Sequence, residues 1–172
     1  YLTKPLGIGI LTTAQKKGLL SGDDLTLAKK LMLTLNRLGT DLGKIPGVTA
    51  LTDVTGFGLL GHLIEVCEGS GVSARIDFKK VPVIDVARAY LEQKCIPGGT
   101  NRNFSSYGRK VSPLVDQQRD ILCDPQTSGG LLVAVMPDSI EDVMAVFHHH
   151  GLAPESFGKI IPKDDYVVMV QK

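Results

Sequence analysis

The sequence contains no tryptophan, few cysteines and no apolar run long enough to span a membrane. The three cysteines, Cys67, Cys95 and Cys123, are odd in number and widely spaced, which argues against a disulfide framework and against a zinc knuckle. We interpret them as small buried hydrophobic residues in a protein of the reducing cytoplasm, and we expect no membrane partner.

The sequence also lacks an excess of charge of either sign. The chain has 19 Lys and Arg residues and 18 Asp and Glu residues, for a net charge of +1, and no basic stripe is visible. A nucleic-acid partner is therefore not expected. Two common nucleotide motifs are missing as well: the Gly-rich loop that ends in Gly-Lys-Ser/Thr, and the Gly-x-Gly-x-x-Gly turn of dinucleotide-binding folds.

What remains is the composition of an ordinary globular domain, with 43% hydrophobic and 22% charged residues. The apolar periodicity and the Gly and Pro breaks predict one α+β domain over residues 1–172, with helices packed on a mixed β-sheet around a single core. Strands are predicted at 2–12, 72–78 and 131–136, a terminal hairpin or strand pair at 157–162 and 165–171, helices at 23–38, 58–68, 84–94, 113–122 and 138–150, and a loop at 97–108.

The first candidate binding segment is 51–62, where a Gly-flanked turn precedes a predicted helix. Gly56 and Gly58 allow close approach of a ligand or a positive φ, and the free N–H groups of the first helical turn favour an anion. Asp53 beside such a site could hold Mg²⁺ that bridges to phosphate oxygens. The alternative is that Asp53 or Thr55 only caps the helix.

Two further Gly-rich segments are candidates for anion binding. Residues 123–130 place Thr127, Ser128 and Gly129 in a tight turn that either presents N–H groups to an anion or lets two backbones pack closely. Residues 97–103 contain a Gly-Gly turn beside Arg102. A guanidinium pairs well with phosphate, but an exposed structural loop explains the same residues equally well.

Together, these segments resemble a known family. Asp-Val-Thr-Gly-Phe-Gly-Leu-Leu-Gly-His at 53–62 is similar to the C-terminal domain of the aminoimidazole-ribonucleotide synthetase superfamily. Asp-Pro-Gln-Thr-Ser-Gly-Gly-Leu-Leu at 124–132, Pro-Gly-Gly-Thr-x-Arg-Asn-Phe at 97–104 and Leu-Thr-Lys-Pro-Leu-Gly at 2–7 resemble the selenophosphate synthetases within it. The resemblance covers essentially the whole chain. Ile8 departs from the pattern, since a Thr is expected there.

The resemblance implies an α+β fold and an enzyme of selenium metabolism. Selenophosphate synthetases convert selenide, ATP and water to selenophosphate, AMP and phosphate with the help of Mg²⁺, and the product serves selenocysteine biosynthesis. It implies that residues 1–172 are the C-terminal domain of a longer cytoplasmic enzyme, homodimeric as a whole. The N-terminal ATP-binding domain, with the nucleophilic Cys or selenocysteine and a catalytic Lys, would be absent. The start at Tyr1, without methionine, is taken as the boundary of such a fragment.

Several expectations for this chain follow from the resemblance. It contains no catalytic residue, Asp53 is the metal ligand, and an apolar patch beside the 53–58 turn faces the N-terminal domain. Two other readings remain open: another enzyme of the same superfamily, of the purine-pathway synthetase type, and a stand-alone binding or scaffold domain. The residues expected to contact ATP are Thr55, Gly56, Gly58, Arg102, Thr127, Ser128 and Gly129.

Overall fold

Five short strands form two sheets in the computed structural model, which describes residues 1–171. In the first sheet, β1 (Val48–Asp53) pairs antiparallel with β3 (Leu131–Val135). In the second, β2 (Val72–Asp77) lies between β4 (Gly158–Pro162), which is antiparallel to it, and β5 (Val168–Gln171), which is parallel. The second sheet is therefore mixed. The two C-terminal strands flank β2 and do not form a hairpin with each other.

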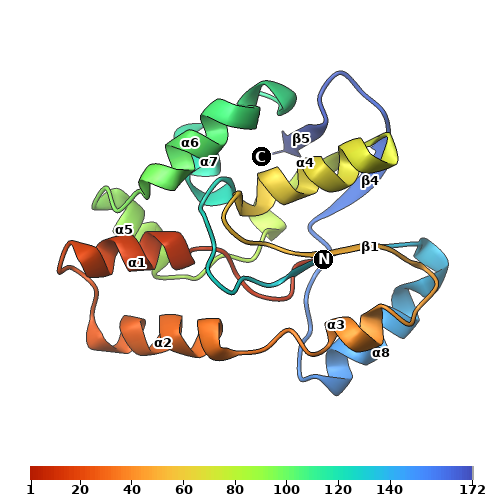
Figure 1. Cartoon of the computed structure of the whole chain (residues 1–172), viewed down its shortest axis with the longest axis horizontal. Coiled ribbons are helices and arrows are strands. Elements are labelled where there is room, and N and C mark those ends of the chain that lie inside the picture. Colours follow the sequence, from red (N-terminus) through yellow and green to blue (C-terminus); the bar gives the residue numbers. More distant parts are fainter. Residues whose placement is uncertain (172) are drawn as a thin grey trace.

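Helices cover these sheets and make up most of the regular structure (Figure 1). Helix α4 packs against β2, while α3 and α8 lie together at one end of the molecule, next to the β1–β3 sheet. The predicted α+β class with packed helices is confirmed. The helices are α1 (Ile8–Lys16), α2 (Gly22–Leu33), α3 (Gly39–Leu42), α4 (Gly58–Ser70), α5 (Ala87–Glu92), α6 (Gly98–Tyr107), α7 (Asp116–Leu122) and α8 (Ile140–His149).

The strand predicted at 2–12 is wrong beyond its first residues. Leu2 makes an isolated antiparallel bridge to Leu132, but Ile8 begins α1. The helix forms there because its first N–H groups are satisfied by side chains from a distant segment: Gln126 accepts from Gly7 and Ile8, and Asp124 accepts from Gly9. Such a long-range cap leaves no local pattern in the sequence.

The loop predicted at 97–108 is also wrong, because this segment forms α6. Its glycines stand in the first turn, directly after Pro97, where they interrupt no established helix. Thr100, Asn103 and Tyr107 then lie on one face and are buried. That helical spacing of polar residues escapes a search for apolar periodicity.

The remaining helices differ from prediction mainly in length. The helix predicted at 23–38 ends at Leu33, since Thr34 is extended and a separate turn, α3, follows. The helices predicted at 58–68 and 138–150 are confirmed to within two residues. Those predicted at 84–94 and 113–122 begin three residues later than expected. No helix among residues 1–171 has the length and apolar character needed to cross a membrane.

Apolar side chains form two clusters, one on each face of β3, and not the single core that was predicted. Leu132 belongs to the larger cluster with α1 and α4, whereas Leu131 and Val133 belong to a smaller one with α3 and α8. The apolar run of β3 is therefore covered on both faces, as predicted. All three cysteines are buried and free, which confirms their interpretation as core residues.

Candidate functional site

A cleft of ≈ 600 Å³ forms where the Gly-rich segments meet the first helix. Its charged lining residues are Lys16 and Arg102, both basic and both exposed. Such a cleft favours an anionic ligand. The lining residues are Gly9, Thr12, Thr13 and Lys16 from α1; Gly56; Pro97, Gly98, Gly99, Arg102 and Asn103 from the start of α6; and Pro125 and Thr127.

The N-terminus of α6 forms one wall of this cleft. The chain arrives extended at Pro97, and no side chain caps the helix, so the N–H groups of Gly98 and Gly99 are at its free end. Arg102 lies one turn further on, with Nη1 3.4 Å from where a Cβ on Gly98 would be. Helix-terminal N–H groups and a guanidinium on one wall form an arrangement suited to phosphate oxygens.

Asn103 holds the three Gly-rich segments together. Its buried side-chain amide donates to the carbonyl of Gly56 at 2.9 Å and to that of Cys123 at 3.0 Å. One turn later on the same helix face, the Tyr107 hydroxyl donates to the carbonyl of Phe57 at 2.7 Å. Sequence reasoning missed both roles because it assigned this segment to a loop. The spacing of Asn103 and Tyr107 was the available signal.

The turn after β1 leaves Asp53 exposed, opposite Leu131 at the end of the β1–β3 ladder. Helix α4 begins without any side-chain cap in this part of the structure, so neither Asp53 nor Thr55 caps it. The backbone N–H of Thr55 donates to Nε2 of His62 at 3.1 Å. The other ring nitrogen, Nδ1, lies 3.2 Å from Glu65. His62 therefore accepts through Nε2 and carries its proton on Nδ1, toward Glu65.

The predicted contact residues separate into those that line the cleft and those that do not. Gly56, Arg102 and Thr127 line the cleft. Gly58 has φ +70°, and a Cβ there would lie 2.8 Å from the backbone of Cys123, while a Cβ on Gly129 would meet the carbonyl of Val54 at 2.0 Å. For these two glycines the structure supports the close-packing alternative.

The Thr55 hydroxyl and the Ser128 carbonyl make internal contacts. The Thr55 hydroxyl lies 3.2 Å from Nε2 of His62. Ser128 adopts φ +50°, and its carbonyl accepts from the buried Lys4 ammonium at 2.7 Å. The same ammonium donates to the carbonyl of Thr34. Lys4 therefore fixes the 127–130 turn against the end of α2.

Asp124 and Gln126 connect this turn to α1. The Gln126 side chain accepts from Gly7 and Ile8 at 3.2 Å each, and Asp124 Oδ2 accepts from Gly9 at 3.1 Å and from Gln126 Nε2 at 2.7 Å. Burial raises the pKa of Asp124 to about 7, against the opposing effect of these hydrogen bonds. The sequence reasoning assigned neither side chain a role.

Metal ligands are sparse in the described residues, which contain no group of three or more His, Cys, Asp or Glu placed to hold an ion. Asp53 is an exposed carboxylate that makes no side-chain hydrogen bond with another residue among 1–171. Mg²⁺ usually takes one or two protein carboxylates and completes its shell with water and phosphate oxygens. The donor set at Asp53 therefore fits an ion that arrives with a phosphorylated ligand.

Comparison with protein families gives one match over nearly the whole chain: residues 1–171 match the model described as "AIR synthase related protein, C-terminal domain". Curated relatives named "Selenide, water dikinase" include one from Aeromonas hydrophila, 58% identical over 93% of this chain and 46% of that protein. Another, from Bordetella bronchiseptica, is 54% identical over 99% of this chain and 49% of that protein. The chain spans about half the length of these relatives.

Solved structures show the same fold at low sequence identity. E. coli HypE, a hydrogenase maturation protein, has a TM-score of 0.67 at 20% identity and covers 99% of this chain, which corresponds to 45% of HypE. Thiamine-monophosphate kinase from Stenotrophomonas maltophilia also has a TM-score of 0.67, at 19% identity, with 99% and 48% of the two chains covered. A HypE structure in complex with ATP matches with a TM-score of 0.59 at 19% identity over 94% of this chain and 41% of that one.

Proposed function

Because this chain belongs to the family of AIR synthase related proteins, as their C-terminal domain, we propose that it is half of an enzyme that makes selenophosphate. The reaction would consume selenide, ATP and water and release AMP and phosphate. The parent protein, meaning this longer enzyme, would contribute an N-terminal domain with the reacting nucleophile. The identity of 58% to a selenide, water dikinase supports the choice of this reaction over others in the family.

The observation that carries a role for this half is the basic cleft between α1 and α6. Lys16, Arg102 and the free N–H groups of Gly98 and Gly99 are the groups that would hold phosphate oxygens of ATP. The ATP complex of a HypE structure with the same fold supports a nucleotide as the ligand. Phosphoryl transfer depends mostly on positioning and charge neutralisation, so such contacts would contribute directly to rate.

Magnesium would be held at Asp53. Its carboxylate is exposed and lies at the end of β1, three residues before Gly56 in the lining of the cleft. When bound, Mg²⁺ would neutralise charge on the phosphate oxygens. Asp53 would provide one anchor, and the N-terminal domain would provide the others.

The remaining predicted contacts act through the backbone. Gly58 and Gly129 let the 53–58 and 127–130 turns pack against neighbouring backbone, which places Gly56 and Thr127 at the cleft. Thr55 and Ser128 fix the same turns through His62 and Lys4. We propose that these four residues position the ATP contacts and do not all touch ATP themselves.

In the cell, the parent protein would be a cytoplasmic homodimer that supplies selenophosphate for selenocysteine biosynthesis. The dimer and the N-terminal domain are expectations of the family resemblance. The sequence gives independent support only for a reducing compartment, through three buried, free cysteines.

The test is to replace Arg102 in the parent protein and to measure AMP formation at varied ATP. Arg102→Ala should raise the KM for ATP by about tenfold or more, because a charged phosphate contact contributes roughly 1.5–3 kcal/mol. The KM of Arg102→Lys for ATP should lie between those of the unmodified protein and Arg102→Ala, since lysine keeps the charge but loses the planar guanidinium. Arg109→Ala is the matched control, because Arg109 is exposed but stands outside the cleft.

An unchanged KM for ATP in Arg102→Ala would contradict the cleft assignment. The two other readings have separate outcomes. A parent protein that uses ATP but not selenide would be another enzyme of the superfamily. A parent protein that binds ATP without turnover of any kind would be a binding or scaffold protein.

A further inference from the structure

The first three residues of the chain lie antiparallel along the free edge of β3, around the isolated bridge between Leu2 and Leu132. The amino group of Tyr1 donates to the carbonyl of Val133 at 2.9 Å, and the Val133 N–H donates back to Tyr1 at 3.0 Å. Leu2 then faces Leu132, and Thr3 N–H donates to the carbonyl of Leu131 at 3.1 Å. These bonds define an antiparallel ladder whose next pair lies before Tyr1.

The partner for that next pair is already in place. Along β3, the N–H groups of Leu131 and Val133 point toward the N-terminal segment, whereas Met136 donates to Gly47 on the β1 side. By the two-residue alternation of a strand, Val135 directs its N–H and carbonyl to the same side as Val133. Within residues 1–171, no segment lies there to pair with them.

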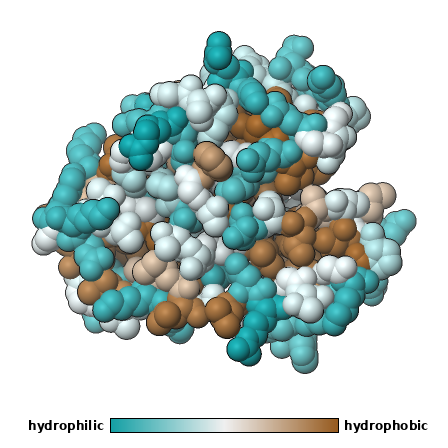
Figure 2. Space-filling model, in the orientation of Figure 1, coloured by the Kyte–Doolittle hydropathy of each residue, from teal (hydrophilic) through white to brown (hydrophobic). Residues whose placement is uncertain are grey.

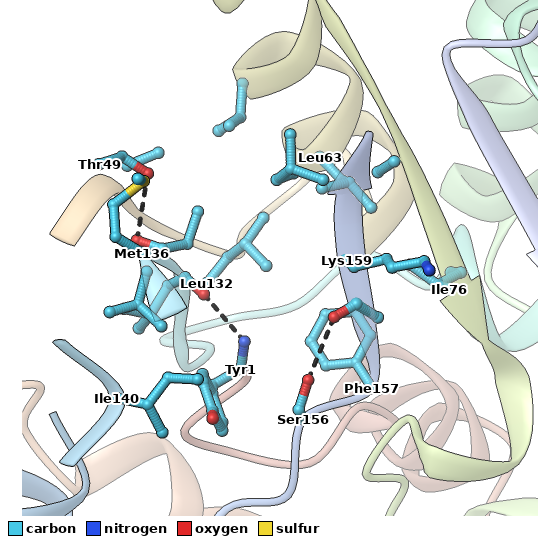
Figure 3. Close-up of a pocket in the computed structure, with 18 of the residues that line it drawn as sticks. Tyr1, Thr49, Leu63, Ile76, Leu132, Met136, Ile140, Ser156, Phe157 and Lys159 are labelled. Atoms are coloured by element: carbon cyan, nitrogen blue, oxygen red, sulfur yellow. Dashed lines mark hydrogen bonds between the residues drawn. The ribbon is translucent and has the colours of Figure 1, made fainter. Parts of the chain in front are cut away.

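That side of β3 opens into an apolar groove of ≈ 520 Å³ (Figure 3). Leu132 and Met136 lie on one side of it, Lys159 and Phe157 of the β4 segment lie on the other, and Tyr1 stands at its base. Figure 2 shows apolar side chains gathered on this face of the molecule, beside an indentation between α4 and the β1–β3 sheet. The groove thus separates two sheet edges, since β3 and β4 are each the outer strand of their own sheet.

We propose that this groove is filled by the residues that precede Tyr1 in the parent protein, which continue the Tyr1–Thr3 strand along β3. The inserted strand would lie between β3 and β4 and join the two sheets into one. This inference rests on the proposed function only in taking the chain to be the C-terminal half of a longer protein. The relatives, about twice as long as this chain, supply the necessary length.

Three observations favour this occupant over a second protein. The ladder already runs in the required direction, so a preceding residue that continues it enters the groove. Burial lowers the pKa of the Tyr1 amino group to about 6, and an uncharged peptide N–H in its place would keep the bond to Val133 without that desolvation cost. Finally, two unpaired sheet edges beside each other are rarely left open in native proteins.

The proposal also predicts the character of the inserted residues. Paired residues of an antiparallel ladder share a face, so the residue directly before Tyr1 would lie beside Ala134, on the face of Leu132 and Leu63. Ala134 is small and leaves room for a large apolar side chain. The residue before that would lie beside Val135, on the face where Tyr1 packs against Phe147 at 5.6 Å between ring centroids.

Amide hydrogen exchange of the parent protein tests the proposal, with Val133 as the internal reference because its N–H is bonded in the present structure. Val135 should exchange within about tenfold of Val133. If Val135 exchanges more than tenfold faster, no strand covers it, and the proposal is overturned. Residues 1–172 alone lack the inserted strand, so in that chain Val135 should exchange more than tenfold faster than Val133. Equal protection of the two residues there would also overturn the proposal.

A second measurement uses Ile160, which lines the groove on β4 and is 43% exposed in this chain. If the inserted strand covers it, Ile160→Lys should lower the melting temperature of the parent protein by several degrees, and an unchanged melting temperature would count against the strand. AMP formation is recorded separately. Protection of Val135 without selenophosphate formation would support this inference and refute the proposed function. Selenophosphate formation without protection of Val135 would support the proposed function and refute this inference.

Discussion

At the scale of single residues, the structure excludes one of the two roles considered for Asp53. Sequence reasoning left two explanations for it, a metal ligand or a helix cap. In the described structure α4 has no side-chain cap, and Asp53 is exposed at the end of β1. Because the capping explanation fails, the metal explanation is the one left to test.

We predict that Asp53→Asn in the parent protein lowers turnover by at least ~10-fold at limiting Mg²⁺ and raises the Mg²⁺ requirement. The melting temperature should stay nearly constant, since within the described part of the chain Asp53 makes no side-chain hydrogen bond that the substitution would break. AMP production across a Mg²⁺ titration measures the effect. Asp138→Asn is the control, as Asp138 is exposed and distant in sequence from the turn. Equal Mg²⁺ curves for both variants would remove Asp53 from the metal site.

Asp124 shows how a carboxyl group can serve structure in its neutral form. It is fully buried at the start of α1, where the helix dipole and the Gly9 N–H favour the charged form. Desolvation is the larger effect and raises the pKa to about 7. The folded protein therefore keeps a proton on this group up to neutral pH, while the unfolded chain loses it near the ordinary value of 3.8.

This shift predicts a pH dependence of stability with a definite sign. Between about pH 4 and pH 7 the folded state binds more protons at Asp124 than the unfolded state, so the stability contributed by this group falls as pH rises through that range. The slope is at most about 1.4 kcal/mol per pH unit. Asp124→Asn, which cannot ionise, should remove this contribution to the slope. Urea unfolding of the parent protein and the variant at several pH values measures the difference, and parallel curves for the two would contradict the shifted pKa.

At the scale of elements, the start of α4 depends on a single backbone conformation. Gly58 has φ +70° and lies against the backbone of Cys123, so a Cβ at this residue would strain the start of the helix. Asn103 and Tyr107 on α6 hold the same turn through the carbonyls of Gly56 and Phe57. The helix start and the cleft are therefore fixed by the same contacts.

Gly58→Ala should destabilise the parent protein by about 1–3 kcal/mol, since alanine is strained at positive φ and its Cβ would press on Cys123. Gly69 in the same helix is the matched control, because a Cβ there meets nothing within 4 Å. Gly69→Ala should be neutral or stabilising by up to ~1 kcal/mol. Thermal unfolding compares the two variants. A Gly58→Ala protein as stable as Gly69→Ala would refute the packing role of Gly58.

At the scale of the whole molecule, the proposed function assigns the reacting nucleophile to the N-terminal domain of the parent protein. The three cysteines of this chain are buried, and desolvation raises the pKa of Cys67 and Cys123 to about 11, which keeps both as inert thiols. Phe57, in the turn between Asp53 and Gly58, is 54% exposed, and it is the apolar side chain that the proposed N-terminal domain would cover beside the site.

We therefore predict that residues 1–172 alone release no AMP from ATP and selenide, while the parent protein does so under the same conditions. The physical reason is that charge neutralisation in the cleft cannot replace a missing reacting group. An assay of AMP formation with both preparations checks this. The Arg102→Ala variant of the parent protein serves as a reference for weakened ATP binding in the cleft. AMP release by the short chain at the rate of the parent would overturn the division of roles.

The sequence alone determined the features that depend on neighbouring residues. The apolar run at 131–136 predicted a strand buried on both faces, and helical spacing after Gly58 predicted α4. The motifs at 53–62 and 124–132 predicted the family. These signals are local, because apolar periodicity and glycine turns are encoded by a few consecutive residues.

Only the tertiary structure decided the features that depend on distant residues. Helix α1 replaced a predicted strand because Asp124 and Gln126, more than 100 residues away, satisfy its first N–H groups. Gly56, Arg102 and Thr127 proved to share one cleft, whereas Gly58 and Gly129 proved to pack against backbone. A sequence pattern cannot distinguish a glycine that meets a ligand from one that meets a carbonyl, since both need the same missing Cβ and differ only in what the fold places opposite it.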